Sequence, residues 1–357
     1  MDNKKVLVAM SGGVDSSVAV KLLQSQGYEC AGATMRLYSN EDIGQEKLKT
    51  CCSLDDTTDA KLAAMKLGIE HFVFNMSDDF KCFVIDHFVR SYIEGRTPNP
   101  CIECNKHLKF GRFLKRAQLL GYDNIATGHY VLREFDEQSG RWLLKRSPDL
   151  SKDQSYVLYN MTQFELEHTL FPCGGLEKTN IRDIAQQNGL VNADKPDSQD
   201  ICFIPDGDYA AFIERAEGEQ PKGDILLKDG TKLGEHKGLI RYTIGQRKGL
   251  GVSYSEPLFV AAKDIEHNTL ILGTNDDIFS TSLIAKNCNF IKFDKLTQPC
   301  RCKVQTRYHQ TPSDCVITPL DDNRVLCEFD KPHRAVSRGQ AAVFYDGDYV
   351  LGGGEIE

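Results

Sequence analysis

The segment from Ser11 to Ser17 has a composition suited to binding phosphate groups. It reads Ser-Gly-Gly-Val-Asp-Ser-Ser, so glycines can bring backbone N–H groups close to an anion and hydroxyls can donate further hydrogen bonds. Asp15 has the same charge as phosphate, which favours a role as a magnesium ligand or as an orienting group. The alternative is that these polar residues only cap a helix. The segment has neither the Gly-Lys-Ser/Thr ending of a Walker A loop nor the Gly-x-Gly-x-x-Gly pattern of dinucleotide sites.

Cysteines form a second group of residues able to do chemistry. Of the thirteen, Cys101 and Cys104 share the segment Thr-Pro-Asn-Pro-Cys-Ile-Glu-Cys-Asn-Lys, and Cys202 lies in Asp-Ser-Gln-Asp-Ile-Cys-Phe-Ile. Thiolates attack sulfur–sulfur bonds, most readily where a helix N-terminus or a nearby cation lowers the pKa of the thiol. Cys104 lies just before a predicted helix and is followed by Lys106, His107 and Lys109, so its environment suits a lowered thiol pKa.

Other interpretations of these cysteines remain open. Cys101-x-x-Cys104 has the spacing of two zinc ligands, although the sequence has no second Cys-x-x-Cys to complete a four-cysteine site. With Cys202 and one further ligand, the same two cysteines could hold an iron–sulfur cluster. Cys104 and Cys202 could also be two inert thiols among the thirteen cysteines.

Apolar periodicity predicts the elements that position these residues. Residues 5–10 form a β-branched apolar run typical of a buried strand, and the next apolar residues follow a helical step from Val14 to Gln26, ended by Gly27. The alternation continues with predicted strands at 31–37, 71–76 and 125–131, predicted helices at 55–67, 78–94, 108–120 and 178–188, and an irregular loop at 193–205. This pattern predicts an α/β fold with a doubly wound parallel sheet, which binds ligands at the carboxyl ends of its strands.

The pattern changes after about residue 206 to short alternating runs separated by glycine turns. Residues 225–233 and 343–351 both contain an Asp-Gly turn between such runs, which is typical of β structure. We therefore predict an α/β domain at 1–205 with both catalytic cysteines, a small β-rich central domain at 206–275 and a C-terminal β-barrel-like domain at 276–357.

Charge and hydropathy restrict the class of protein. A formal net charge of -8 and a pI near 5.7 argue against a generally basic nucleic-acid coat, although a local basic face is compatible with them. Apolar runs stay well short of the roughly 20 residues that span a bilayer. The first five residues are too polar to begin a secretory signal. We expect a cytoplasmic protein with no membrane partner, in which most cysteines are free thiols.

The Ser11–Ser17 loop resembles the PP-loop of the N-type ATP pyrophosphatases, which cleave ATP between the α and β phosphates and leave AMP on a substrate oxygen. Both cysteine segments resemble those of the bacterial tRNA-specific 2-thiouridylases within this superfamily. Further similar motifs lie at 126–130, 152–156, 242–251 and 339–345, so the resemblance spans nearly the whole chain. It implies a sulfurtransferase with a PP-loop-type α/β domain that uses ATP and Mg²⁺.

The resemblance also implies the substrate and the reaction. The wobble uridine of the lysine, glutamate and glutamine tRNAs would be adenylated on its C2 oxygen, and sulfur would then replace AMP, giving 2-thiouridine, AMP and pyrophosphate. Sulfur has to arrive as a persulfide, and a second thiol can cut its sulfur–sulfur bond. Cys202 would carry the persulfide, charged by a cysteine desulfurase or a sulfur-relay protein, and Cys104 would be the nucleophile that ends as its disulfide partner.

Further residues match binding positions of the family. Those matching ATP contacts are Ala9, Met10, Ser11, Gly12, Gly13, Val14, Asp15, Ser16, Met35 and Gly128. Those matching contacts with the uridine or with tRNA are Asn99, Pro100, Cys101, His129, Lys152, Asp153, Gln154, Arg307, Tyr308 and Gln340. Taken alone, Asn99 could cap a turn, Met35 could be a core residue, Gly128 could form a turn, and the tRNA contacts could be ordinary surface residues.

One position departs from the family. Some members carry aspartate where this sequence has Cys101, and that carboxylate is a natural acid–base group. Its role stays unassigned here among the Cys101 thiol, another group and water. Two rival functions remain, a PP-loop amidotransferase or ligase acting on a small metabolite, and a non-enzymatic RNA-binding or sulfur-carrier protein. The sequence shows no recognisable ammonia-generating domain.

Overall fold

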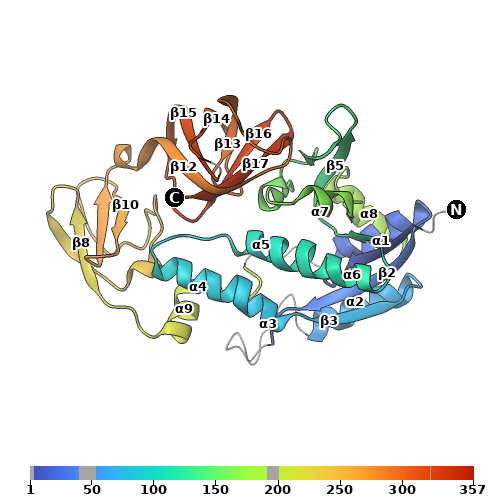
Figure 1. The fold of residues 1–357 in the computed structure, drawn as a ribbon. Helices are drawn as coiled ribbons and strands as arrows, with labels where there is room; N and C mark the ends of the chain where they lie inside the picture. Colours follow the sequence, from blue (N-terminus) through green and yellow to red (C-terminus); the bar gives the residue numbers. More distant parts are fainter. Residues whose placement is uncertain (1–3, 40–53, 191–200, 322) are drawn as a thin grey trace.

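The computed structural model describes residues 4–39, 54–190, 201–321 and 323–357. The chain forms three parts, an α/β part, a small β part with strands β8 to β11 and a C-terminal barrel (Figure 1). Helices α4 to α6 belong to the α/β part, and α4 and α5 run below the barrel in this view. No helix of the described ranges is long and apolar enough to cross a membrane.

The α/β part is built on a parallel sheet with helices on both faces. Its strands, in the order β3-β2-β1-β4-β7, are β3 (His71–Asn75), β2 (Glu29–Arg36), β1 (Lys5–Ala9), β4 (Asn124–Ala126) and β7 (Thr169–Leu170). Along β1, Val6 and Val8 pack into one core and Leu7 into the other, because successive side chains of a strand point to opposite faces. The prediction of a doubly wound parallel sheet is therefore confirmed.

Helices on the two faces come from different stretches of the chain. The Val6 face is covered by α1 (Val14–Ser25), α2 (Leu54–Lys66) and α8 (Lys178–Gln187). The Leu7 face is covered by two long helical runs, each interrupted by a π-helical stretch. The first run consists of α3 (Ser77–Phe80), η1 (Lys81–Ile85) and α4 (Asp86–Ile93), and the second of α5 (Pro100–Glu103), η2 (Cys104–Phe113) and α6 (Leu114–Leu119).

The second run begins at Pro100 rather than at residue 108, so this predicted boundary is wrong. The Asn99 side chain accepts a hydrogen bond from the Cys101 N–H at 3.1 Å and caps the helix. Proline fits the first helical position because its missing N–H needs no partner there. Cys104 consequently lies inside the helical run and not in front of it.

The strand predicted at 125–131 is present but shorter than predicted. β4 ends at Ala126, and β5 (Val131–Asp136) belongs to a different sheet, where it pairs with β6 (Arg141–Arg146). The intervening Gly128 packs against the Ser11–Ser17 loop, where a Cβ atom would lie 2.9 Å from the Asp15 Cβ. Close packing on the loop thus draws the chain away from the parallel sheet.

The central part contains a helix that the sequence pattern did not predict, α9 (Tyr209–Glu217), capped by the Asp208 side chain. Its four-stranded sheet has the order β10-β11-β8-β9. The strands are β8 (Gly223–Leu227), β9 (Lys232–His236), β10 (Phe259–Asp264) and β11 (Thr269–Gly273). Short helical segments elsewhere are η3 (Ser155–Leu158), α7 (Gln163–Glu167), η4 (Leu239–Arg241) and η5 (Asp276–Ile278).

Six strands form the C-terminal barrel, in the order β12-β15-β14-β13-β16-β17, and pairing of β12 with β17 closes it. They are β12 (Phe279–Phe290), β13 (Cys300–Gln305), β14 (Ser313–Pro319), β15 (Arg324–Arg334), β16 (Ala341–Asp346) and β17 (Tyr349–Ile356). The hairpin β5–β6 of the α/β part attaches to β17 through the pair Tyr349 and Lys145. The sheet of the barrel therefore includes two strands from the α/β part.

Candidate active site

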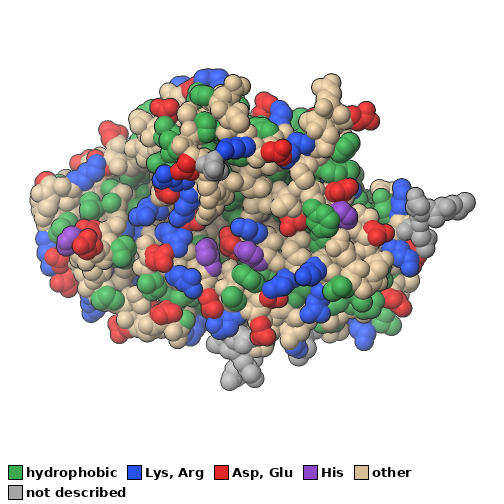
Figure 2. Space-filling view, in the orientation of Figure 1, with side chains coloured by type: hydrophobic (Ala, Val, Ile, Leu, Met, Phe, Trp, Pro, Cys, Tyr) green, Lys and Arg blue, Asp and Glu red, His purple; other side chains and the backbone are tan. Residues whose placement is uncertain are grey.

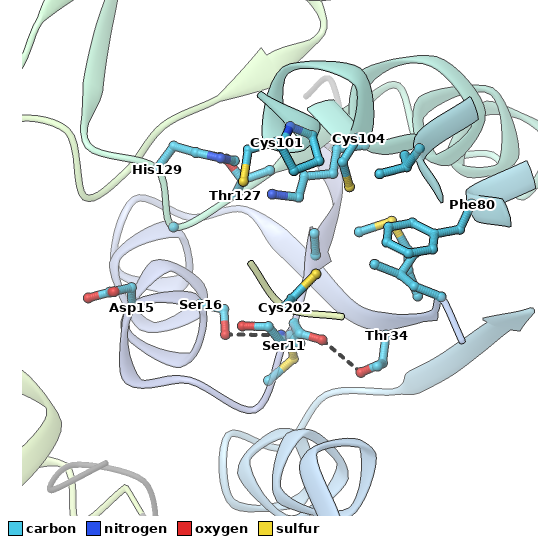
Figure 3. Close-up of a pocket in the computed structure, with 18 of the residues that line it drawn as sticks. Ser11, Asp15, Ser16, Thr34, Phe80, Cys101, Cys104, Thr127, His129 and Cys202 are labelled. Atoms are coloured by element: carbon cyan, nitrogen blue, oxygen red, sulfur yellow. Dashed lines mark hydrogen bonds between the residues drawn. The ribbon is translucent and has the colours of Figure 1, made fainter. Parts of the chain in front are cut away.

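A cavity of about 370 Å³ lies at the carboxyl ends of β1, β2 and β4 (Figure 3). This is where a doubly wound sheet was expected to bind ligands, and the volume suits a small molecule. Its lining residues are Ala9, Met10, Ser11, Asp15, Ser16, Thr34, Met35, Leu37, Phe80, Val84, Pro100, Cys101, Cys104, Lys109, Thr127, Gly128, His129, Gln154, Ile201, Cys202 and Phe203.

The loop after β1 leads directly into α1, whose N-terminus adjoins the cavity. Gly13 is the N-cap residue, and no side chain forms a capping hydrogen bond there. Ser16 Oγ instead donates to the Gly13 carbonyl at 3.0 Å and accepts from the Ser11 N–H at 3.4 Å. The printed contacts of Ser16 are therefore not those of an N-cap side chain, and a helix N-terminus at the cavity suits a phosphate group.

Gly12 gives the loop its shape. Its φ of +73° lies in the left-handed region, and a Cβ atom would stand 2.6 Å from the Asp56 carbonyl oxygen. Only glycine combines this conformation with this close approach. Gly12, Gly13 and Val14 shape the loop without themselves lining the cavity.

Asp15 is tied to other elements of the fold. Its two carboxylate oxygens accept hydrogen bonds from Lys178 Nζ at 2.7 and 2.9 Å, and the Tyr130 hydroxyl donates to one of them at 2.7 Å. The side chain points away from the cysteines of the cavity (Figure 3). Of the two roles expected for Asp15, this geometry supports the orienting one.

Cys104 is buried at the start of η2. Burial raises the pKa of its thiol to about 11, although the charge of Lys109 acts in the opposite direction. The predicted lowering of this pKa is wrong because the helix begins at Pro100, and because loss of hydration outweighs the cation. Cys101 is accessible to solvent from the cavity, but the protein around it raises the pKa of that thiol as well.

Cys202 faces the same cavity from the opposite side (Figure 3). Its neighbour Phe203 is buried, with ring centroids 5.6 Å from Phe80 and 5.4 Å from Phe88, and the Tyr38 hydroxyl donates to the Cys202 carbonyl. These contacts fix the backbone that presents the thiol. Cys101, Cys104 and Cys202 are not in disulfide bonds with one another. The motif residues 197–200 lie outside the described residues.

No group of three His, Cys, Asp or Glu side chains in the described ranges could hold a metal ion. The three cysteines thus share a cavity without forming a preformed zinc or cluster site. This arrangement fits thiol chemistry, in which two sulfur atoms meet during the reaction.

Two polar residues and one apolar wall complete the cavity. His129 is buried, its Nδ1 lies 2.8 Å from Thr127 Oγ1, and burial lowers its pKa well below the usual value. Gln154 Oε1 accepts from the Tyr130 N–H at 3.0 Å. The apolar wall consists of Met35, Leu37, Phe80 and Val84.

Comparisons with known proteins agree with this geometry. A profile described as tRNA methyl transferase HUP domain matches residues 4–206, a PRC-barrel domain profile matches 210–274, and an aminomethyltransferase beta-barrel domain profile matches 280–356. The tRNA-specific 2-thiouridylase MnmA 2 of Caldanaerobacter subterraneus subsp. tengcongensis is 52% identical over 357 residues, covering 99% of this chain and 98% of that protein. MnmA 1 of Clostridium botulinum strain Loch Maree is 49% identical over 355 residues and 99% of both chains.

The chain belongs to the tRNA-specific 2-thiouridylase family. It is therefore a tRNA-modifying sulfurtransferase that uses ATP, as the resemblance implied. Among solved structures, the U34-tRNA thiolase NcsA of Methanococcus maripaludis has a TM-score of 0.34 and 18% identity, covering 60% of this chain and 67% of that one, which is too low to support an argument.

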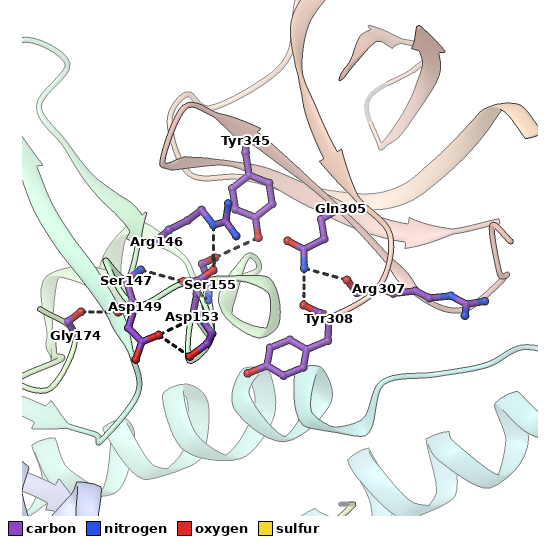
Figure 4. A network of polar contacts seen from close by, with 11 residues as sticks. Arg146, Ser147, Asp149, Asp153, Ser155, Gly174, Gln305, Arg307, Tyr308 and Tyr345 are labelled. Atoms are coloured by element: carbon purple, nitrogen blue, oxygen red, sulfur yellow. Dashed lines mark hydrogen bonds and ion pairs between the residues drawn. The ribbon is translucent and has the colours of Figure 1, made fainter. Parts of the chain in front are cut away.

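In this thiouridylase, several residues expected to touch tRNA form internal contacts. Asp153 accepts hydrogen bonds from Arg146 Nε at 3.1 Å and from Ser155 Oγ at 2.7 Å, within the network of Figure 4. Lys152 is half-buried next to it. His129 and Gln154 line the cavity and do not lie on the outer surface, so the surface interpretation of these two is wrong.

Three barrel residues hold the parts of the thiouridylase together. An Arg307 terminal nitrogen donates to the carbonyls of Ile244 and Ala335, joining the central part to the barrel. The Tyr308 hydroxyl interacts with the Gln154 side chain, and burial raises its pKa to about 12. Gln340 Nε2 donates to the Thr97 carbonyl at 2.8 Å, three residues before Pro100. The barrel therefore contacts the segment that leads into the cysteine helix.

Sequence reasoning missed other residues of this thiouridylase site. Lys178 had no local signal because it lies 163 positions from Asp15. Thr34 Oγ1 donates to the Met10 carbonyl at 2.7 Å and connects β2 to the start of the loop. In the sequence, a threonine within a strand does not indicate such a contact. Lys109 lines the cavity, and its five-residue spacing from Cys104 becomes meaningful only in a π-helix.

Proposed function

We propose that this enzyme thiolates C2 of the wobble uridine in the lysine, glutamate and glutamine tRNAs through a persulfide on Cys202. The observation that supports the proposal is the shared cavity, which brings the Ser11–Ser17 loop, the N-terminus of α1 and two opposed thiols, Cys104 and Cys202, within one space. Activation of the uridine oxygen and delivery of sulfur can thus occur without moving the base between sites.

The loop residues provide an anion site for the ATP phosphates. Backbone amides of a glycine-rich loop and a helix N-terminus stabilise phosphate charge. Ser11, Ser16, Ala9 and Met10 line this end of the cavity. Met35 and the neighbouring apolar wall suit the adenine ring, and Gly128 lets the β4–β5 connection approach closely.

Mg²⁺ fits this site if most of its protein-side ligands are replaced by oxygens of the ATP phosphates. Asp15 is the sole carboxylate among the described lining residues, and Lys178 already neutralises it. Mg²⁺ commonly binds through substrate phosphates, one or two carboxylates and water, so this donor set is compatible with it. Bound there, the ion would offset the charge of the leaving pyrophosphate.

Sulfur transfer uses the two opposed thiols in sequence. The terminal sulfur of the Cys202 persulfide attacks C2 of the activated uridine, and AMP leaves with the former O2. The Cys104 thiolate then attacks the Cys202 sulfur and breaks the sulfur–sulfur bond, which leaves sulfur on the uridine and a Cys104–Cys202 disulfide. A thiol reductant restores both thiols, and a cysteine desulfurase or sulfur-relay protein recharges Cys202.

The uridine enters beside the start of the cysteine helix. A base in a single-stranded loop leaves its stack at low cost, as this chemistry requires. Pro100 and Cys101 line the cavity, while Asn99 uses Oδ1 for capping and has its Nδ2 group to donate to the base. The Cys101 thiol or the neutral His129 is positioned for the proton transfer that a carboxylate performs in other members.

The outer surface near the cavity is suited to tRNA phosphates. In Figure 2, Lys and Arg side chains gather beside the hollow between the barrel and helices α4 and α5, although the net charge is -8. Cations near such an entrance attract the tRNA backbone. Lys152, Asp153, Arg307, Tyr308 and Gln340 belong to the interface under this surface and shape the edge that tRNA contacts.

The test is thiolation of unmodified lysine tRNA with ATP, Mg²⁺ and a persulfide donor, with 2-thiouridine measured by mass spectrometry and pyrophosphate measured in parallel. We expect Cys202→Ser and Cys104→Ser to abolish 2-thiouridine, and the exposed Cys82→Ser to retain it. Pyrophosphate release that depends on tRNA should persist in both inactive variants. Full thiolation by either variant, or pyrophosphate release stimulated by a small metabolite and not by tRNA, would contradict the proposal.

A further inference from the structure

The π-helical stretch η2 (Cys104–Phe113) brings Cys104 and Lys109 onto the same side of the helix. In a π-helix, hydrogen bonds join residues five apart, so residue 109 follows residue 104 by about one turn. An α-helix would turn the same pair well away from each other. Gly111 accommodates the wider turn, because a Cβ there would lie 3.0 Å from the Lys106 carbonyl oxygen.

Among the described residues that line the cavity, Lys109 is the one lysine or arginine. Both Lys109 and Cys104 line it, and Lys109 is half-buried. Among the described residues, Lys109 has no hydrogen-bond or ion-pair partner. The carboxylate lining the same cavity, Asp15, is paired with Lys178. The ammonium of Lys109 is therefore available to an anion that forms in the cavity.

The titratable groups around the Lys109 ammonium indicate which anion it can stabilise. The charge of Lys109 acts on Cys101, Cys104 and His129 alike, and lowers the pKa of each. His129 is held neutral by burial, so it does not compete as a cation. Cys202 faces the two helix thiols across the cavity. The anions that this arrangement can create are thiolates.

We propose that Lys109 is a positioning residue that stabilises the thiolate of Cys104 when this sulfur attacks the persulfide-bearing Cys202. The inference rests on the proposed function, and it explains how a buried thiol ionises. Cys104 loses a proton to solvent, its electron pair forms the bond to the Cys202 sulfur, and the electrons of the broken sulfur–sulfur bond stay with the transferred sulfur. Lys109 keeps its proton throughout and supplies charge only.

The test measures the ionisation of Cys104 directly, without tRNA or ATP. Isotope-coded iodoacetamide labels the native protein at a series of pH values, and mass spectrometry follows the peptide with Cys104. We expect Lys109→Gln to move the midpoint of the rate profile to higher pH and to slow alkylation at pH 8 about tenfold. Lys109→Arg should restore most of the rate, and Lys106→Gln, an exposed lysine of the same helix, should match the wild type.

An unchanged alkylation profile in Lys109→Gln would overturn the inference. If the unchanged profile came with a raised KM for ATP, the ammonium would be assigned to phosphate binding instead. Failure of the proposed function appears differently, as absence of 2-thiouridine in the wild type while the alkylation profile still depends on Lys109. Circular dichroism and the unfolding midpoint confirm that each variant is folded.

Discussion

Lys178 Nζ lies 2.7 and 2.9 Å from the two carboxylate oxygens of Asp15, which joins helix α8 to the loop that begins α1. The Tyr130 hydroxyl adds a third bond at 2.7 Å from the chain beyond β4. The position of the loop is thus set by two other stretches of the sequence. These contacts explain how a loop rich in glycine and serine keeps one conformation.

Replacing Asp15 should destabilise the protein through Lys178. Both side chains are largely buried, with 30% and 11% exposed, so Asp15→Asn leaves an ammonium without its counter-charge. We expect a loss of about 3 kcal/mol in the free energy of unfolding, measured by urea denaturation. The double variant with Lys178→Met should recover part of it. Additive losses in the double variant would show that the pair is not coupled.

The two adjacent glycines of the loop should differ sharply in their tolerance of alanine. Gly12→Ala forces a side chain into a φ of +73° and against the Asp56 carbonyl, so we expect a loss of about 2–4 kcal/mol in unfolding free energy and weak ATP binding. Gly13 has a φ of −84°, and the atom nearest to its added Cβ is Ser11 Oγ at 3.4 Å. Gly13→Ala should therefore stay within about 1 kcal/mol of the wild type. Equal losses in both would contradict this account of the loop.

His129 should make the folded protein sensitive to mild acid. Burial lowers its folded pKa, whereas the unfolded chain binds a proton near the ordinary value of 6.5. The stabilisation is therefore complete above pH 6.5 and is lost as the pH falls, by at most about 1.4 kcal/mol per pH unit. We expect His129→Asn to flatten the dependence of unfolding free energy on pH between 6.5 and 5. The exposed His309→Asn serves as the control, and an unchanged slope in His129→Asn would refute the assignment.

The contact between Arg96 and Glu355 should control the order of the cysteine helix. Arg96 NH1 lies 2.7 Å from Glu355 Oε1, and both side chains are mostly buried between the barrel and the segment before Pro100. We expect Arg96→Ala to increase amide hydrogen exchange in residues 96–104 and to lower kcat for thiolation severalfold, with little change in the KM for ATP. The exposed Arg90→Ala should leave both unchanged. Unaltered exchange in Arg96→Ala would mean that the barrel does not restrain this helix.

The sequence was most informative where a pattern is local. Alternating strands and helices around the Ser11–Ser17 loop follow from apolar periodicity, and the sheet has the expected parallel order. The Pro100 start of the cysteine helix was missed, although Asn99 followed by proline is an N-terminal helix signal. The strand expected at 125–131 is shorter than predicted, because the packing of Gly128 on Asp15 draws the chain away from the sheet despite the apolar run.

Properties that depend on distant residues could not be predicted in this way. The ionisation of Cys104 depends on its burial within η2. The π-helical register of this helix is not visible in the apolar periodicity of the sequence. The internal roles of Asp153 and Gln340 depend on partners from other elements. The two domain boundaries at 205 and 275 remain predictions, as do the individual contacts with ATP and tRNA.

The attachment of β5–β6 to β17 affects how the enzyme is assembled during synthesis. Strand β17 is translated some two hundred residues after the hairpin that it joins, and it also carries Glu355, the partner of Arg96. A nascent chain still lacking β17 can form its parallel sheet and its phosphate loop. The segment leading to Cys101 then lacks its contacts with the barrel. Ribosome-bound intermediates would thus hold nucleotide before they can transfer sulfur, and thiol chemistry would wait until β17 has been synthesised.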